Sequence, residues 1–315
     1  MGKNRNKVSA IVVYKDRLPR DELCSDYELL PGSDTQGIHF YKLLIACIRS
    51  LIEAGVDETI VVKYHDEQSI RLPWSNVRVL DYCNTSDFSE WDAKWFGIMH
   101  ASNVLLITTN ADILINENVV NWFRGQACSS PLTLFQGTKG WLNREQTFNY
   151  LSKGVLDVCL HEVITKVCKE RGEVFVDGIE PSNWASRRKA CEIYLDKTGL
   201  DLWKHAGDFQ AFNRCLLSEI NYPLGSSGWG WGDNELRIRV KEASMMECWN
   251  RSSPVWHLWH PVRSWKKREQ DALNNMTLWQ RKIDFSAGVN QWVQPSPERI
   301  KSAIIKGGRL CCLKK

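Results

Sequence analysis

The sequence has no hydrophobic run long enough to cross a membrane and no segment typical of a secretory signal. A transmembrane helix needs roughly 18 or more apolar residues in a row, and no stretch of the chain approaches that length. Residues 1–7 are polar and are followed at once by a short apolar run, not by the longer apolar core of a signal peptide. We therefore expect no transmembrane segment and a cytoplasmic location, as in a bacterial or viral enzyme.

The eleven cysteines lack the pattern of a disulfide framework or a zinc ribbon. Their number is odd, their spacing is irregular and they form no Cys-x-x-Cys pair, which favours reduced thiols in a cytosol. Long basic runs are also missing. The net charge is only +4, and the densest basic cluster is the short segment 263–268. A cluster of this size is more typical of a solvated face, so nucleic acid is an alternative partner that the sequence does not favour.

Tryptophan, in contrast, is abundant. The hydrophobic content of 43% and the charged content of 25% are ordinary for a globular chain of 315 residues. Fifteen residues are tryptophan, however, and six of these lie between positions 229 and 265. Crowded indole rings are compatible with stacking on sugars or bases, and equally with a well-packed core.

Short β-branched runs alternate with amphipathic stretches in the N-terminal half of the chain. The predicted strands are 8–16, 58–64, 77–82 and 103–109, and the predicted helices are 40–55, 89–102 and 151–170, with Ser89 as an N-cap and Gly55 as a C-cap. This alternation indicates an α/β fold whose mostly parallel central sheet is flanked by helices. Ligands of such sheets bind beyond the carboxyl ends of the strands, where Asp16, Asp81 and Asp112 are expected.

Four residues have side chains suited to catalysis or metal binding. Asp112 follows a buried strand, where a carboxylate could hold a divalent cation against a diphosphate, although it could also be a turn or capping residue. His257 and His260 are three positions apart, which on a helix would place both rings on one face, although His257 could be a core histidine. Asp233, in GWGWGDNEL (228–236), could be a general base on a Gly-Trp bend or could cap the helix that follows.

Together, Asp112, the segment 207–236 and the segment 256–261 (WHLWHP) resemble the nucleotide-sugar glycosyltransferases of the GT-A, or Rossmann-like, fold. Within 207–236, the beginning (GDF) and the end (GWGWGDNEL) are similar to the C-terminal region of the β-1,4-galactosyltransferases and the polypeptide N-acetylgalactosaminyltransferases. The resemblance extends over positions 8–263. It implies one catalytic domain at 1–265, with a nucleotide-sugar-binding half at 1–116, an acceptor and catalytic half at 117–265, and a peripheral extension at 266–315.

The resemblance also implies an activity and its residues. It implies a metal-dependent, inverting hexosyltransferase that moves a sugar from a UDP- or GDP-sugar to a hydroxyl acceptor such as a glycan or glycolipid. Asp233 would be the general base, and Mn²⁺ or Mg²⁺ would be held by Asp112 and His260, with His257 as the other candidate. The implied donor contacts are Tyr14, Asp16, Arg17, Asp81, Trp95, Gly97, Asn110 and Asp112. The implied acceptor or sugar contacts are Asp208, Trp229, Gly230, Trp231 and Glu235.

Three positions depart from the family pattern. Asn110 stands where the family's DxD motif has its first acid, Gly232 stands where a glutamate is usual, and Trp231 stands where a glycine is usual. Trp231 could line the acceptor site or could only pack in the core. These departures leave open a non-catalytic carbohydrate- or nucleotide-binding protein on the same fold. A glycosyltransferase acting on modified DNA bases and a nucleotidyltransferase with a similar sheet are further alternatives.

Overall fold

A computed structural model of the chain describes residues 6–14, 36–64, 70–82, 89–142, 144–154, 173–175, 209–220 and 232–260. Several predicted features lie outside these residues. They are Asp16, Arg17, Asp208, Trp229, Gly230, Trp231, most of the predicted helix 151–170 and the predicted extension 266–315.

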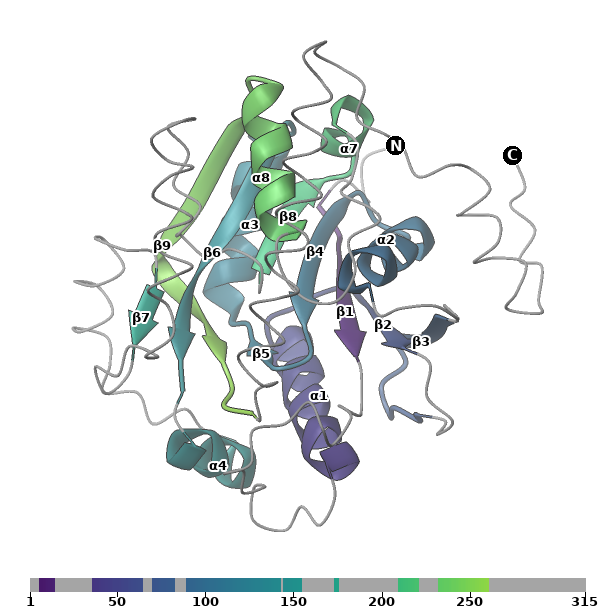
Figure 1. Ribbon diagram of the computed structural model, residues 1–315, viewed down its shortest axis with the longest axis vertical. Coiled ribbons are helices and arrows are strands. Elements are labelled where there is room, and N and C mark those ends of the chain that lie inside the picture. Colours follow the sequence, from purple (N-terminus) through teal and green to yellow (C-terminus); the bar gives the residue numbers. More distant parts are fainter. Residues whose placement is uncertain are drawn as a thin grey trace.

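One mixed sheet forms the centre of the described structure (Figure 1). Its strands follow the order β3-β2-β1-β4-β8-β6-β9-β5, and the short β7 pairs with β6 outside this path. β1 to β4 are parallel to one another, β8 runs antiparallel between β4 and β6, and β6 and β9 are again parallel. The strands are β1 Val8–Tyr14, β2 Glu58–Tyr64, β3 Val77–Tyr82, β4 Leu105–Asn110, β5 Ile113–Leu114, β6 Thr133–Trp141, β7 Glu173–Phe175, β8 Phe209–Asn213 and β9 Met246–His257.

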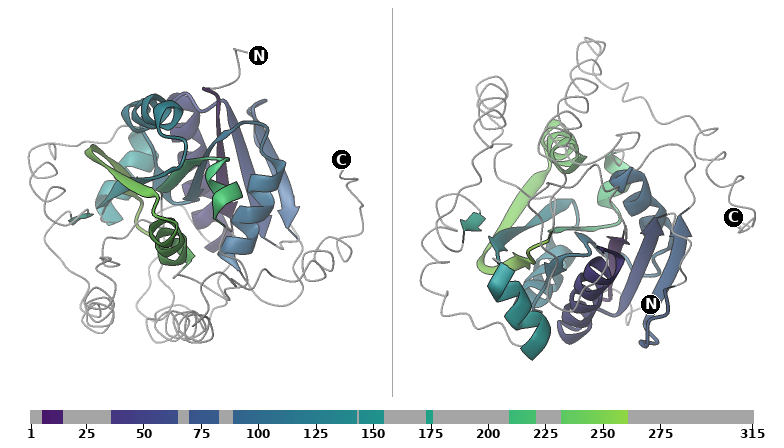
Figure 2. Two further views of the ribbon diagram at one scale, coloured as in Figure 1. Left: turned by 90° about the horizontal axis from the view of Figure 1, so that it is seen from above. Right: turned by 60° about the horizontal axis from the view of Figure 1, so that its bottom comes forward.

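Helices cover both faces of this sheet (Figure 2). Successive strand residues point to opposite faces, so Leu105 and Ile107 of β4 pack with α1 and α3, whereas Leu106 packs with α2, α7 and α8. The helices are α1 Gln36–Glu53, α2 Glu90–His100, α3 Glu117–Ser129, α4 Arg144–Lys153, α7 Leu216–Glu219 and α8 Gly232–Glu242. The predicted α/β fold with a mostly parallel sheet flanked by helices is confirmed.

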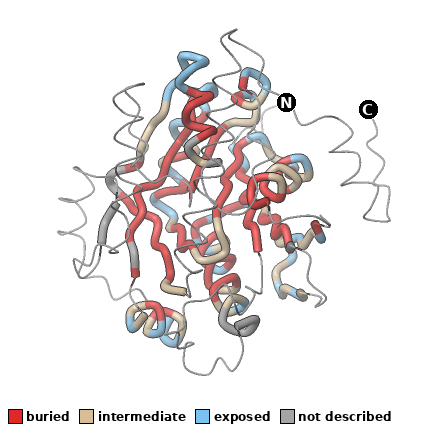
Figure 3. The backbone as a smooth tube through the Cα atoms, in the orientation of Figure 1, coloured by how far each residue is buried: buried red, intermediate tan, exposed pale blue. Residues whose placement is uncertain are grey.

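The buried strands explain the apolar runs of the sequence (Figure 3). Every residue of β1 is buried, because helices cover both sides of a strand in a sheet of this kind, and all of its side chains except Ser9 are apolar or aromatic. Local signals mark the start of α2 and the end of α1, as predicted. Ser89 Oγ accepts a hydrogen bond from the Asp92 backbone N–H at 3.2 Å, and Gly55, which follows α1, has a φ of +79° that favours glycine.

A cluster of hydrogen bonds around Glu58 joins β2 to its neighbours at the amino end of the sheet. The Glu58 carboxylate accepts hydrogen bonds from Ser9, Ser102 and Arg78. Partial burial raises the pKa of Glu58, but the hydrogen bonds from these donors lower it by more. The pKa of Glu58 therefore lies below its ordinary value. This edge of the sheet therefore holds a charge that stabilises the fold and lies opposite the candidate site.

No helix in the described ranges has both the length and the apolarity that a bilayer crossing requires.

Candidate metal centre

The three candidate metal ligands come from two chain segments that meet beyond the carboxyl end of β4. Asp112 lies in the turn between β4 and β5, His257 is the last residue of β9, and His260 follows shortly after. Ile113 of β5 pairs with His257 in antiparallel register. The backbone N–H of Leu258 donates to the Asp112 carbonyl oxygen at 2.8 Å. Sheet pairing thus brings together residues that are far apart in the sequence.

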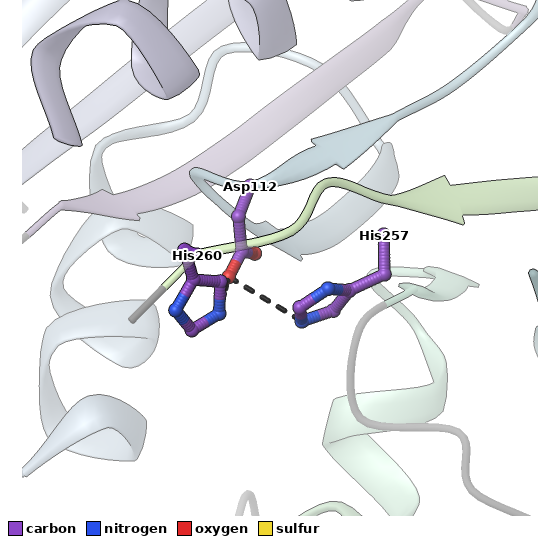
Figure 4. Close-up of side chains that lie close together, drawn as sticks. All are labelled: Asp112, His257 and His260. Carbon is purple, nitrogen blue, oxygen red and sulfur yellow. Dashed lines mark ion pairs between the residues drawn. The ribbon is translucent and has the colours of Figure 1, made fainter. Parts of the chain in front are cut away.

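Both imidazole rings lie beside the Asp112 carboxylate (Figure 4). Asp112 Oδ2 is 2.8 Å from His260 Nε2 and 3.5 Å from His257 Nε2, and one ligand atom from each of the three residues lies within 4.8 Å of the others. The three side chains are mostly buried, with exposed fractions between 9% and 17%. A carboxylate oxygen and two imidazole nitrogens at such spacing form a donor set that fits a divalent transition metal ion.

The helical arrangement considered for the two histidines is wrong. His257 ends a strand, and residues 258–260 are neither helix nor strand. The backbone N–H of Trp259 donates to Thr147 Oγ1 of α4 at 2.7 Å, and Thr147 is fully buried. This contact holds the chain as it leaves β9, and the two rings then lie 5.0 Å apart between centroids. Thr147 is a supporting residue that the sequence reasoning missed.

Helix α1 supports the cluster from one face of the sheet. The Phe40 ring packs against His260 with a centroid distance of 5.9 Å, and Cys47 Sγ donates to the Asn110 carbonyl oxygen at 3.5 Å. Burial, together with the nearby charge of Asp112, raises the pKa of the Cys47 thiol well above its ordinary value, so the thiol stays protonated. Helical periodicity identified α1 as a core helix, but it carried no signal for these two contacts.

Asp233 lies in the first turn of α8 and is half-buried. Its backbone carbonyl accepts a hydrogen bond from Gln210 Nε2 at 3.3 Å, and Gln210 on β8 pairs with Thr108 on β4. The first turn of α8 is therefore attached to β8, the neighbour in the sheet of the strand that leads to Asp112. The Gly-Trp bend expected at 228–231 lies outside the described residues.

Glu235 is also in the first turn of α8, where it forms an ion pair within the helix. Its side chain is 5% exposed, and Oε1 lies 2.5 Å from Arg239 Nη2, one turn further along. Arg239 thus gives the buried Glu235 carboxylate a partner of opposite charge. The role of Glu235 in acceptor binding stays a prediction.

Besides Asp112 and Asn110, which ends β4, the described donor-side candidates lie on β1, β3 and α2. Tyr14 is buried at the end of β1. Asp81 on β3 is largely exposed and lies 3.2 Å from Lys63 Nζ. Trp95 and Gly97 lie inside α2. A Cβ at Gly97 would come within 2.4 Å of a side-chain carbon of the sheet, so this glycine packs the helix closely on the strands.

Fold and site together define an α/β protein with an Asp-His-His cluster at the carboxyl edge of its sheet. No family model matches the chain, and no curated protein matches it. Among solved structures, it is similar to GalNAc-T7 in complex with UDP, GalNAc and Mn²⁺, at 12% identity and a TM-score of 0.46. That similarity covers 81% of this chain but only 44% of the GalNAc-T7 chain.

A second similar structure is glucosyl-3-phosphoglycerate synthase from Mycobacterium tuberculosis, in complex with Mn²⁺, UDP-glucose and phosphoglyceric acid. The identity is 14% and the TM-score 0.46, and the similarity covers 87% of this chain and 79% of that chain. A mycobacterial protein is similar at 13% identity and a TM-score of 0.43, over 81% of this chain and 68% of the other.

Proposed function

We propose that the chain is a divalent-metal-dependent glycosyltransferase of the GT-A fold that uses a nucleotide-sugar donor. The observation that carries the proposal is the cluster of Asp112, His257 and His260, whose ligand atoms lie within 4.8 Å of one another. Ligands of open α/β sheets bind at this edge. The resemblance of 207–236 and 256–261 to the sugar-transferring families supplies the type of reaction.

Asp112, His257 and His260 are the residues that would hold the metal ion. With a divalent cation held by these residues, the site would stabilise the negative charge that develops on the departing nucleoside diphosphate. Two of the three donors are imidazole nitrogens, which suits Mn²⁺ better than Mg²⁺, because Mg²⁺ prefers oxygen ligands in a near-octahedral shell. Asn110 in place of an acid leaves the cluster with one carboxylate and therefore less negative charge.

Asp233 would be the general base. Its carboxylate would accept the proton of the acceptor hydroxyl as that oxygen forms a bond to the anomeric carbon of the donor sugar. The bond from this carbon to the diphosphate oxygen breaks in the same step, the bonding electrons leave with the nucleoside diphosphate, and the configuration inverts. This role is supported by the position of Asp233, which is half-buried in the first turn of α8.

The donor is a UDP- or GDP-sugar, and the acceptor is a glycan, a glycolipid or another hydroxyl compound. Tyr14, Asp81, Trp95 and Gly97 stay candidate donor contacts. A cytoplasmic location, consistent with cysteines that the structure leaves free at Cys47, Cys128, Cys215 and Cys248, is part of the same proposal.

A donor screen tests this function. The full chain is incubated with Mn²⁺ and a panel of UDP- and GDP-hexoses, and nucleotide release is measured. We expect release from at least one donor, abolished in Asp112→Ala and lowered roughly 10²- to 10⁴-fold in Asp233→Asn. Glu117→Gln is the matched control, because Glu117 is an exposed acid in the first turn of α3, and we expect it to keep wild-type release.

The alternatives predict other outcomes. Donor binding without release from any member of the panel would favour the non-catalytic binding protein. Release of pyrophosphate from nucleoside triphosphates would favour a nucleotidyltransferase, and transfer only to DNA containing modified bases would favour the nucleic-acid acceptor. Wild-type turnover in Asp233→Asn would remove Asp233 as the base.

A further inference from the structure

A fully buried glutamine on β8 contacts the first turn of α8. The Gln210 side chain has an exposed fraction of 0%, and its Nε2 donates to the carbonyl oxygen of Asp233 at 3.3 Å. Burying an amide costs free energy unless the amide makes hydrogen bonds. The bond to Asp233 offsets part of that cost and links the sheet directly to the helix that carries the proposed base.

Gln210 lies on a strand that is hydrogen-bonded on both sides. It pairs with Thr108 of β4 and with Gln136 of β6, and its own carbonyl oxygen accepts a hydrogen bond from Thr108 Oγ1 at 3.4 Å. β4 continues past Thr108 to Asn110, and Asp112 follows in the next turn. The strand that leads to the metal centre therefore also holds the strand from which Gln210 reaches Asp233.

A second attachment holds α8 one turn further along. Arg237 Nε and Nη2 donate to the Glu247 carboxylate of β9 at 2.5 and 3.2 Å. Gln136 Nε2 donates to the same carboxylate at 3.2 Å. Asp233 and Arg237 are four positions apart and so lie on the same side of the helix. Gln136, which contacts Glu247, and Gln210, which contacts Asp233, are partners in the sheet. The two contacts that hold α8 therefore involve neighbouring residues of β6 and β8.

We infer that Gln210 is a positioning residue, which sets the place of Asp233 relative to the metal centre. This inference rests on the proposed function, in which Asp233 takes the acceptor's proton. The Arg237–Glu247 pair holds the body of α8, so loss of the Gln210 hydrogen bond shifts the first turn without releasing the helix. A displacement of about 1 Å in a reacting group can lower a rate by roughly 10²-fold.

Gln210→Met tests the inference in the full chain, because methionine fills a similar volume but has no N–H donor. We expect kcat to fall by roughly 10- to 100-fold, with the KM for the donor and the affinity for Mn²⁺ unchanged. Backbone amides of 235–238, which donate to carbonyl groups at the start of α8, should exchange with deuterium faster than in the wild type. Thr59→Val is the control: it removes a buried hydroxyl from β2, and we expect wild-type kcat and exchange in α8.

Gln210→Glu adds a pH-dependent readout. The introduced carboxyl group can donate a hydrogen bond to the Asp233 carbonyl oxygen only while it is protonated. The ratio of variant to wild-type kcat should therefore rise as the pH falls, whereas the ratio for Gln210→Met should stay flat. A flat ratio for both variants contradicts the inference.

The remaining outcomes separate this inference from the proposed function. Wild-type kcat in Gln210→Met overturns the inference, even if the melting temperature falls, because the role of Gln210 is then only structural. Unchanged exchange at 235–238 also overturns it, whether or not a donor is known. Wild-type kcat in Asp233→Asn overturns instead the assignment of the base, and it leaves the exchange result as it was.

Discussion

Replacing Gly97 by alanine should destabilise the protein, because helix α2 lies very close to the sheet at this position. A Cβ atom on residue 97 would lie 2.4 Å from Ile11 Cγ2 and 2.8 Å from Val62 Cγ2. Both side chains are fully buried in β1 and β2. Both are also β-branched and therefore stiff about χ1. The added methyl group must push the helix away from the strands, since neither side chain can turn aside.

Two effects of opposite sign set the size of this change. Alanine is the better helix former by roughly 1 kcal/mol. Overpacking a core usually costs about 1–3 kcal/mol. We expect the upper end here, because both contacts are far shorter than the roughly 3.5 Å at which carbon atoms attract. The net effect of Gly97→Ala is therefore a loss of about 1–2 kcal/mol in the free energy of unfolding.

Urea unfolding of Gly97→Ala and Gly125→Ala checks this reasoning. Gly125 lies inside α3 and has no atom within 4 Å of a Cβ built on it, so only the helix propensity changes. We expect Gly125→Ala to raise the urea midpoint and Gly97→Ala to lower it, with the denaturant dependence unchanged in both. A Gly97→Ala variant as stable as the wild type would refute the close packing of α2.

Three further changes test other parts of the structure. Asp112→Ala should remove the rise in melting temperature that Mn²⁺ gives the wild type; an equal rise in both proteins would contradict the metal centre. Arg237→Met should lower the free energy of unfolding by about 3–5 kcal/mol, because it leaves the Glu247 carboxylate without its cationic partner, and adding Glu247→Leu should restore most of this loss in urea unfolding. Because the pKa of Glu58 is lowered in the folded state from 4.5, its carboxylate stabilises the fold above that pH, and this stabilisation is lost as the pH falls through the folded pKa. Glu58→Gln should therefore be less stable than the wild type near pH 7, with a difference that shrinks in acid; a difference that grows in acid would contradict this.

Much of the α/β fold could be predicted from local patterns. A strand covered on both faces is rich in apolar residues on both, so β1 stands out as a short apolar run and β4 begins as one. Ser89 and Gly55 bound helices through interactions with their neighbours in sequence. The order of the strands carries no such local signal. That β8 enters the sheet antiparallel, between β4 and β6, depends on how distant surfaces pack.

The candidate site divides in the same way. The sequence by itself determined the residue types, since Asp112, His257 and His260 are chemically suited to bind a metal ion wherever they lie. Only the tertiary structure decided that they meet, because the pairing of β5 with the end of β9 joins the two segments. It alone decided the role of Gln210, a polar residue between two apolar neighbours in β8, because the role of a buried amide depends on the hydrogen bond that it makes.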